Sequence, residues 1–236
     1  MVFLVVSKNA IAKQRKAFRY ALVSVDSLKL HEHHIAKHLE ELEKEILNDG
    51  VIKRPIIVEK TTLTVLDGTH RVTLARKLGF KKIPALLISY ELAEIRSWAH
   101  IYEGFCDIGF FVKSLVKLMK TSDGEHGNEE FIVKILNSDG DVIDLSFSNI
   151  YKLYWTIHFL DKFVKALGCE VSIIPDTEVE TYTKNPFVAI IPPPIPKSEV
   201  LRVVREGKRF PPKSTRHVLK IQLSDVNVPL KTLYDE

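Results

Sequence analysis

The feature that most restricts the fold is an apolar segment that runs into a helix start with no loop between them. Val65-Leu66 is followed at once by Asp67-Gly68, and Thr69 to Val72 begins a helical pattern. A buried strand that ends in a carboxylate and a glycine, with a helix directly after it, belongs to a layered structure of sheet and helix. Glycine permits close approach of the backbone, and the first N–H groups of a helix have no partner within it.

Periodicity on both sides of this segment predicts the order β, α, β, β, α, β for the first part of the chain. Gly50 stands where the first helix should end. The expected elements are strands at Tyr20–Val25, Arg54–Val58, Leu63–Leu66 and Ile83–Tyr90, and helices at Ile35–Gly50 and Val72–Leu78.

The second part begins with a mostly helical stretch in which Leu92, Ile95, Trp98 and Ala99 share one face. Further expected elements are helices at Phe110–Met119, Asn149–Leu167 and Ser198–Arg205, a hairpin of Phe131–Leu136 with Val142–Phe147, and strands at Glu170–Ile174, Phe187–Ile191 and Val218–Leu223. The fold class is therefore α+β, a mixed α/β arrangement, with a first domain at residues 1–100 and a larger α+β domain at 101–236.

Composition narrows the functional class. The chain has 236 residues, 45% hydrophobic and 27% charged, which is typical of a globular protein. No apolar run approaches the length of a membrane span, and the apolar start is too short for a signal peptide. The two cysteines form no metal-binding or disulfide pattern. We expect a cytoplasmic protein, and the many Lys, Glu and Ile with few Gln favour a thermophile.

Positive charge is concentrated near the C-terminus. Between Lys197 and Lys220 there are eight Lys or Arg residues and two Glu, a net charge of +6. This stretch predicts an anionic partner, such as a nucleotide, a phosphorylated metabolite or nucleic acid. The alternative is an ordinary solvated basic surface.

The segment Asp67 to Arg71 is a candidate phosphate site. Unpaired N–H groups at the helix start, Gly68 and a bidentate cation at Arg71 together suit a phosphate. The spacing is not that of a Walker A loop. A turn at Asp67-Gly68, a cap at Thr69 and a surface ion pair at Arg71 form the alternative explanation.

A second cluster, His31-Glu32-His33-His34, precedes the first long helix. Its histidines lack the four-residue spacing of a helical zinc pair, so zinc is the weaker interpretation. Glu32 at the helix N-terminus would act as a cap favoured by the helix dipole. An ionised carboxylate is also what phosphoryl transfer to a hydroxyl requires as a base or positioning group.

Taken in order, these marks resemble the ParB/sulfiredoxin superfamily domain over about residues 20 to 91. The marks are Val25-Asp26-Ser27-Leu28, His31-Glu32, Asn48-Asp49-Gly50, Arg54-Pro55-Ile56-Ile57-Val58, Asp67-Gly68-Thr69-His70-Arg71, Leu78-Gly79 and Ile83-Pro84-Ala85. The sulfiredoxin branch is excluded because Thr69 stands where its cysteine nucleophile would be. DNA-partitioning ParB is disfavoured by His70 within the motif and by strand patterns downstream.

The archaeal free L-serine kinases are the most similar branch, and the similarity extends to Phe210 to His217. This resemblance implies that Glu32 is the catalytic glutamate and that Asp67 is catalytic and binds Mg²⁺. It implies that Gly68, Thr69, His70 and Arg71 hold the nucleotide phosphates, although Thr69 replaces a second histidine common in such kinases. The implied substrate-binding residues are Trp98, Lys213, Ser214, Thr215, Arg216 and His217.

The resulting prediction is a Mg²⁺-dependent kinase that transfers phosphate from ATP or ADP to free L-serine, giving O-phospho-L-serine for cysteine biosynthesis. L-serine and an adenine nucleotide are the expected partners, and a monomer without a membrane or nucleic-acid partner is expected. Threonine or homoserine is an alternative substrate, because one methyl group is worth only about 1 to 3 kcal/mol in a pocket. A non-catalytic ParB-like nucleotide- or DNA-binding regulator is the alternative function.

Overall fold

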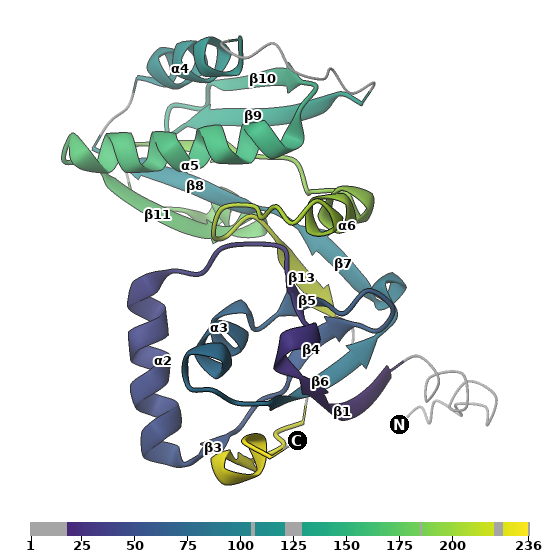
Figure 1. Cartoon of the computed structure of the whole chain (residues 1–236). Helices are drawn as coiled ribbons and strands as arrows, with labels where there is room; N and C mark the ends of the chain where they lie inside the picture. The colour runs from purple at the N-terminus through teal and green to yellow at the C-terminus, as the bar shows by residue number, and fades with distance from the viewer. Residues whose placement is uncertain (1–17, 105–106, 121–128, 185, 220–223, 236) are drawn as a thin grey trace, which may run out of the picture. The chain divides into compact units, whose positions relative to one another are not determined.

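The computed structural model describes residues 18–104, 107–120, 129–184, 186–219 and 224–235 (Figure 1). The chain divides into two compact units, which are described separately below. Unit 1 contains Met1–Glu94, Lys197–Arg209 and His217–Glu236, and unit 2 contains Ile95–Pro196 and Phe210–Arg216.

This division differs from a single split after residue 100. The first boundary, between Glu94 and Ile95, lies close to the predicted one. The C-terminal part does not stay in the second domain, however, because two of its segments belong to unit 1. No local sequence pattern marks this return, since it depends on contacts between segments that are far apart in the chain.

Unit 1 contains the six predicted elements and several short ones. Its elements are β1 Phe18–Ser24, η1 Val25–Ser27, β2 Lys29–Leu30, α2 Ala36–Asp49, β3 Val51–Ile52, β4 Ile56–Glu59, β5 Thr64–Asp67, α3 Thr69–Lys77, β6 Lys82–Ile88, η2 Tyr90–Leu92, α6 Lys197–Arg205, β14 Val228–Pro229 and η4 Leu230–Leu233. Gly50 ends α2 in the left-handed conformation, as its position predicts.

The main sheet of unit 1 has the strand order β1-β6-β4-β5-β2. β6 pairs antiparallel with β1 and parallel with β4, while β5 runs antiparallel to β4 and parallel to β2. Because β2 lies beside β5, the loop that follows β2 starts next to the strand that carries Asp67. The sheet thereby brings the two candidate motifs of the sequence into one region.

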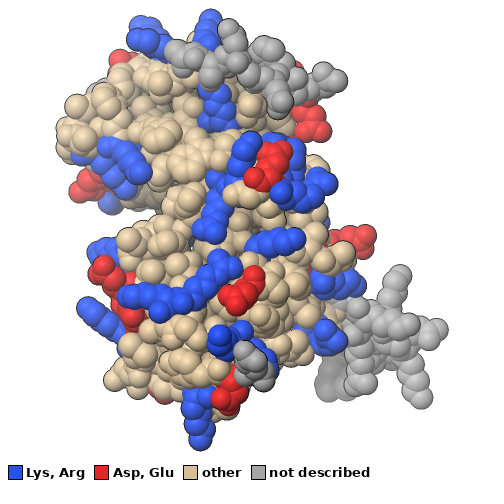
Figure 2. All heavy atoms as spheres, in the orientation of Figure 1, with Lys and Arg blue, Asp and Glu red and all other residues tan. Residues whose placement is uncertain are grey.

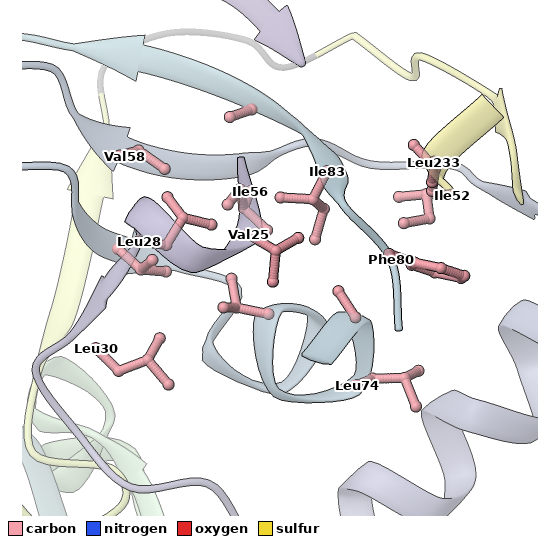
Figure 3. Packing of buried hydrophobic residues seen from close by; sticks show 14 of the residues in the cluster. Val25, Leu28, Leu30, Ile52, Ile56, Val58, Leu74, Phe80, Ile83 and Leu233 are labelled. Atoms are coloured by element: carbon pink, nitrogen blue, oxygen red, sulfur yellow. The ribbon is translucent and has the colours of Figure 1, made fainter. Parts of the chain in front are cut away.

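The core of unit 1 lies between this sheet and α3 (Figure 3). Ile56, Val58 and Ile83 are fully buried, and Val25 and Leu74 are almost so. Leu233 of the C-terminal η4 also packs into this core. Burial of large aliphatic side chains is the main favourable term in folding, so β5 and α3 are anchored by packing on both sides of their junction.

Unit 2 is built on a second five-stranded sheet, in the order β10-β9-β12-β8-β11. Its elements are β8 Trp98–Glu103, α4 Ile108–Lys120, β9 Phe131–Asn137, β10 Val142–Phe147, α5 Ile150–Ala166, β11 Glu170–Pro175, η3 Asp176–Thr181 and β12 Phe187–Ile191. Two further strands, β7 Ala93–Arg96 and β13 Arg216–Leu219, each contain a boundary between the units. Of the predicted strand at 218–223, residues 220–223 lie outside the described part.

Helices α4 and α5 cover one face of the second sheet. Phe111, Leu115 and Ile157 of these helices pack against Val133 and Val188 of the strands. The other face carries a smaller cluster with Ala99, Ile101 and Ala189, joined by Val179 of η3. The hairpin β9–β10 and the helices α4 and α5 agree with the predicted elements.

The helical stretch predicted around residues 92–99 is wrong. These residues form the end of η2, the strand β7 and the start of β8. β8 pairs with both β11 and β12, and its residues from Ala99 to Tyr102 are all buried. A strand buried on both faces shows no alternation of polar and apolar residues, so chance apolar spacing can imitate a helix.

Among the described residues, no helix combines the length and the apolar character needed to cross a bilayer. Cys169 carries a free thiol, and Cys106 lies outside the described residues.

Candidate functional site

The junction of β5 and α3 has a backbone geometry that only glycine fits. Gly68 has φ +102° and precedes the first residue of α3. A Cβ atom on Gly68 would lie 2.5 Å from Cγ2 of Ile56 and 3.2 Å from Nη2 of Arg71. Both the positive φ and the contact with a fully buried isoleucine therefore exclude a side chain here.

The first turn of α3 offers backbone N–H groups to a ligand. The helical hydrogen bonds begin with Val72 N–H, which donates to the Gly68 carbonyl at 3.0 Å. Gly68 is the N-cap residue, and it has no side chain that could accept hydrogen bonds from the N–H groups of the first helical turn. The N-terminal end of a helix carries partial positive charge, so this turn suits an anion such as phosphate.

Arg71 is fixed by three hydrogen bonds. Nη2 donates to Oδ2 of Asp67 at 2.7 Å, and Nη1 donates to the carbonyls of Arg54 at 2.9 Å and Pro55 at 2.6 Å. The side chain of Asp67 is 54% exposed, while that of Arg71 is 17% exposed. Arg71 thus orients the Asp67 carboxylate and holds the loop before β4, and the predicted phosphate contact by Arg71 stays a prediction.

His70 connects α3 to the loop that carries Glu32. Its Nε2 accepts a hydrogen bond from the backbone N–H of Ile35 at 2.9 Å. The ring nitrogen must be unprotonated to accept this bond. His70 therefore positions the segment before α2, a role that the sequence did not suggest, and its predicted phosphate contact is untested.

Glu32 lies between β2 and α2 and its side chain is 17% exposed. The first residue of α2 is Ala36 and its N-cap is Ile35, so Glu32 is too far upstream to cap the helix. The predicted cap is wrong because the helix begins one turn later than the histidine cluster suggested. Oε2 of Glu32 lies 3.9 Å from Nε2 of the buried His31.

His31 is an uncharged part of the core beside this glutamate. Its Nδ1 donates to the Val65 carbonyl at 2.7 Å. Burial lowers the pKa of His31 to about 4, although the bond to Val65 works in the opposite direction. The His31 ring is therefore neutral at pH 7.

His217 of β13 belongs to the same group. Its ring contacts the His31 ring edge to face, with centroids 5.3 Å apart, and Nε2 lies 2.9 Å from the Tyr90 hydroxyl. Burial lowers the pKa of His217 to about 3, assisted by His31 and Lys197, while burial raises the pKa of Tyr90. In unit 1 the structure thus brings together Glu32, His31 and His217.

A hollow of about 470 Å³ adjoins the Arg71 guanidinium in unit 1. It was not predicted, because its walls come from α2, β3, the loop before β4 and the C-terminal segment. The apolar wall is formed by Leu42, Ile46, Val51 and Ile52, and the polar wall by Glu45, Asp49, Lys53, Arg54, Arg71 and Asp225.

Unit 2 contains a second group, centred on the Trp98 indole. The indole N–H donates to the Thr215 carbonyl at 3.0 Å. Lys213 Nζ lies 4.2 Å and Arg216 Cζ 5.8 Å from the centre of the ring. Cation–π contacts thus join Trp98, Lys213 and Arg216, three of the six residues predicted to bind substrate.

Asp176 completes this group and was not predicted. Its Oδ1 accepts a hydrogen bond from Nη2 of Arg216 at 2.7 Å, and each side chain is 22% exposed. Asp176 follows Pro175 at the start of η3, where nothing in the sequence links it to Arg216.

Ser214 has a structural role in this group. Its side chain is buried and the hydroxyl donates to the Pro211 carbonyl at 2.7 Å. Thr215 is also buried and contacts Trp98 through its backbone carbonyl. This arrangement gives no support to a substrate contact by the Ser214 hydroxyl.

The comparisons with known proteins agree with this arrangement of motifs. No protein-family profile matches the chain. A ParB-like protein of Sulfolobus acidocaldarius is 33% identical over 199 residues, covering 83% of this chain and 88% of the relative. The chain belongs to the ParB-like family. The resemblance inferred from the sequence is therefore confirmed at the level of the family.

Two further relatives of the chain have names that state an activity. An ATP-dependent L-serine kinase of Staphylothermus marinus is 26% identical, with 90% of both chains covered. The ADP-dependent L-serine kinase SerK of Thermococcus kodakarensis is 22% identical, covering 93% of this chain and 95% of the relative.

Several solved structures share the fold of this chain. SbnI from Staphylococcus aureus, truncated at its C-terminus, matches with a TM-score of 0.72 at 23% identity, covering 91% of this chain and 88% of that one. A free serine kinase in complex with AMP matches with a TM-score of 0.68 at 20% identity, covering 91% and 93%. The predicted α+β fold is confirmed.

Proposed function

We propose that this ParB-like protein is a kinase that transfers a phosphoryl group from an adenine nucleotide to the hydroxyl of free L-serine. The observation that carries the proposal is the junction of β5 and α3, where Gly68 and the first turn of α3 form a candidate anion site beside the exposed carboxylate of Asp67. L-serine kinases that match nine tenths of the chain support the choice of substrate.

In this mechanism Glu32 is the catalytic base. Its carboxylate accepts a hydrogen bond from the serine hydroxyl and takes the proton as the oxygen attacks the terminal phosphorus. The new O–P bond forms while the bond to the leaving nucleotide breaks. A carboxylate suits this role because its ionised form accepts a proton from a hydroxyl.

The phosphates bind at the first turn of α3 through backbone N–H groups, and the left-handed conformation of Gly68 allows the helix to begin directly after β5. The residues present fit Mg²⁺, because this ion takes one or two carboxylates together with phosphate oxygens and water, and the Asp67 carboxylate is exposed and held by Arg71. When bound, Mg²⁺ neutralises charge on the transferred group.

The hollow beside Arg71 receives the nucleoside. Its apolar wall suits a purine, and its carboxylates suit ribose hydroxyls or an exocyclic amine. Arg71 both lines the hollow and contacts Asp67, so the hollow and the phosphate site share one residue. In unit 2, Arg216 and Lys213 offer positive charge to the carboxylate of the amino acid.

The deciding experiment incubates the purified protein with Mg²⁺ and L-serine, with ATP in one sample and ADP in another. O-phosphoserine, detected by phosphorus NMR or mass spectrometry, is the expected product and identifies the donor. Threonine and homoserine test the breadth of the substrate. Absence of product with both donors, together with intact nucleotide binding, would reject the kinase and leave the nucleotide site.

O-phosphoserine from this reaction would supply cysteine biosynthesis, in the cytoplasm of a thermophilic archaeon. The supporting relatives include one ATP-dependent and one ADP-dependent L-serine kinase.

A ParB-like regulator that binds nucleotide or DNA is the second candidate. The name of the Sulfolobus acidocaldarius relative and the basic stretch from Lys197 to Lys220 favour it. Such a regulator should retard duplex DNA in a gel shift, with retention that falls steeply as salt increases. The kinase should show at most weak retention that is independent of DNA sequence.

A further inference from the structure

The helix α5 of unit 2 carries exposed apolar side chains that the core does not use. Phe159, Phe163 and Leu167 follow one another at intervals of four residues along the helix and its C-cap. These residues are 58%, 53% and 59% exposed. Residues spaced by four lie in one row on a helix, so these three form an apolar ridge.

Aromatic contacts extend this ridge onto α4. The ring of Phe110 stacks on Phe163, with centroids 6.4 Å apart and an angle of 14° between the planes. Phe110 also lines a hollow of about 280 Å³ together with Asp107, Lys113, Ser114 and Lys117. The apolar ridge of α5 and the basic side of α4 therefore belong to one continuous surface.

The charge of this surface is almost entirely positive. Lys113 and Lys117 of α4 and Lys162 and Lys165 of α5 are exposed. The only acidic residue within the two helices is Asp161, which is buried with His100 and Tyr102. Asp107, just before α4, accepts a hydrogen bond from the backbone N–H of Phe110.

We propose that this basic aromatic surface, formed by Lys113, Lys117, Phe159, Lys162, Phe163 and Leu167, docks on an anionic phospholipid bilayer. The rings and Leu167 enter the interface between headgroups and acyl chains, and the lysines contact the headgroups. This is the residue pattern of helices that lie in a membrane surface, with Phe and Leu beside lysines. Figure 2 shows the region over α5 as mostly tan, with blue and a smaller amount of red at its borders.

Charge and shape distinguish the bilayer from other occupants. A second copy would place lysines against lysines, which is unfavourable at an interface. A folded protein partner would need a groove that matches the ridge, whereas a fluid interface accepts a ridge without one. Lysines spread over two helices also match a uniformly anionic layer. The expectation of no membrane partner considered only apolar runs, and it did not address a surface assembled from two helices.

The test uses the full chain and sedimentation with vesicles of phosphatidylcholine, alone or with phosphatidylglycerol. Binding should require phosphatidylglycerol and weaken with salt. The double substitution K113E/K117E should lower the partition coefficient about 20-fold or more, because each lysine near an anionic surface contributes about fivefold. F159S/F163S should lower it about tenfold or more through loss of apolar burial.

Matched controls lie on α2 of unit 1. K37E/K44E changes the net charge by the same amount, and L47S removes an apolar side chain that is 52% exposed. Neither control should change vesicle binding by more than about twofold, since neither site belongs to the docking surface.

Three results would overturn the proposal. They are absence of binding to both kinds of vesicle, an equal loss of binding in the controls, and a concentration-dependent dimer in light scattering that F159S/F163S abolishes. The last result would assign the surface to a second copy of the chain.

Discussion

The two groups of candidate site residues are held in place by different means. In unit 1, Gly68, His70 and Arg71 are fixed through the backbone, by a left-handed φ, a bond to the N–H of Ile35 and bonds to two carbonyls. In unit 2, Trp98, Lys213 and Arg216 are held by side-chain contacts, with Asp176 as the counter-ion. The candidate anion site of unit 1 is thus held by the backbone, whereas the placement of the cations in unit 2 depends on one aromatic ring and one carboxylate.

The largest expected effect comes from the carboxylate at the centre of the unit 1 group. Glu32→Gln should lower kcat about a thousandfold, because general base catalysis contributes factors of about 10² to 10⁴. Nucleotide affinity should stay within about twofold, since the amide preserves the shape of the side chain. The control is Glu40→Gln on the exposed side of α2. Full turnover in Glu32→Gln would remove this residue from the mechanism.

The rigidity of the unit 1 group is tested by Gly68→Ala. The new Cβ would meet Ile56 at 2.5 Å on a backbone with φ +102°, so the free energy of unfolding should fall by about 3 kcal/mol. Gly79→Ala is the control, because its φ is +76° and nothing lies within 4 Å of its Cβ position. The control should lose only about 1 kcal/mol. Equal losses in urea unfolding would contradict a steric role of Gly68.

The dependence of the unit 2 group on its carboxylate is tested by Asp176→Asn. Asp176 is a positioning residue for Arg216, so the KM for L-serine should rise about tenfold while kcat and nucleotide KM change less than about twofold. Asp176→Glu should restore part of the loss. This prediction rests on the proposed kinase activity, and an unchanged serine KM in an active enzyme would reject only the role of Asp176.

The last expected effect concerns stability and not turnover, and it is the pH dependence contributed by His31. Its pKa is about 4 in the folded protein and about 6.5 when unfolded, so the unfolded state binds the proton first as the pH falls. The stability due to neutral His31 is complete above pH 6.5 and is lost towards pH 4, by about 3 kcal/mol. His31→Gln should flatten this loss in thermal unfolding between pH 7 and 4. An unchanged slope would show that His31 is not the group that titrates.

The difference between residues held by the local backbone and residues held by distant side chains also explains which features could be predicted from the sequence. The motif from Asp67 to Arg71 is contiguous because one strand end, one turn and one helix start form the anion site. Gly50 likewise revealed the end of α2 through a local backbone requirement. Such features are visible in consecutive residues, so the fold around them followed from periodicity and the position of glycines.

Features that depend on distant residues could not be predicted in this way. Asp176 lies 40 positions from Arg216, and the hollow beside Arg71 combines α2 with Asp225. The buried strand β8 was mistaken for a helix because its environment, and not its pattern, determines its structure. These elements are specified by pairing across the sheet and by charge partners, which the linear sequence does not display.

The hydrogen bond from Ile35 N–H to His70 joins the segment before α2 to the first turn of α3. A ligand that restrains the first turn of α3 also restrains the segment that carries Glu32, although it need not touch that residue. Linkage is reciprocal. If a ligand at α3 raises the affinity for a substrate beside Glu32 by some factor, that substrate raises the affinity for the ligand at α3 by the same factor. The hydrogen bond at Nε2 of His70 thereby couples the free energy of ligand binding at α3 to that of ordering the Glu32 segment.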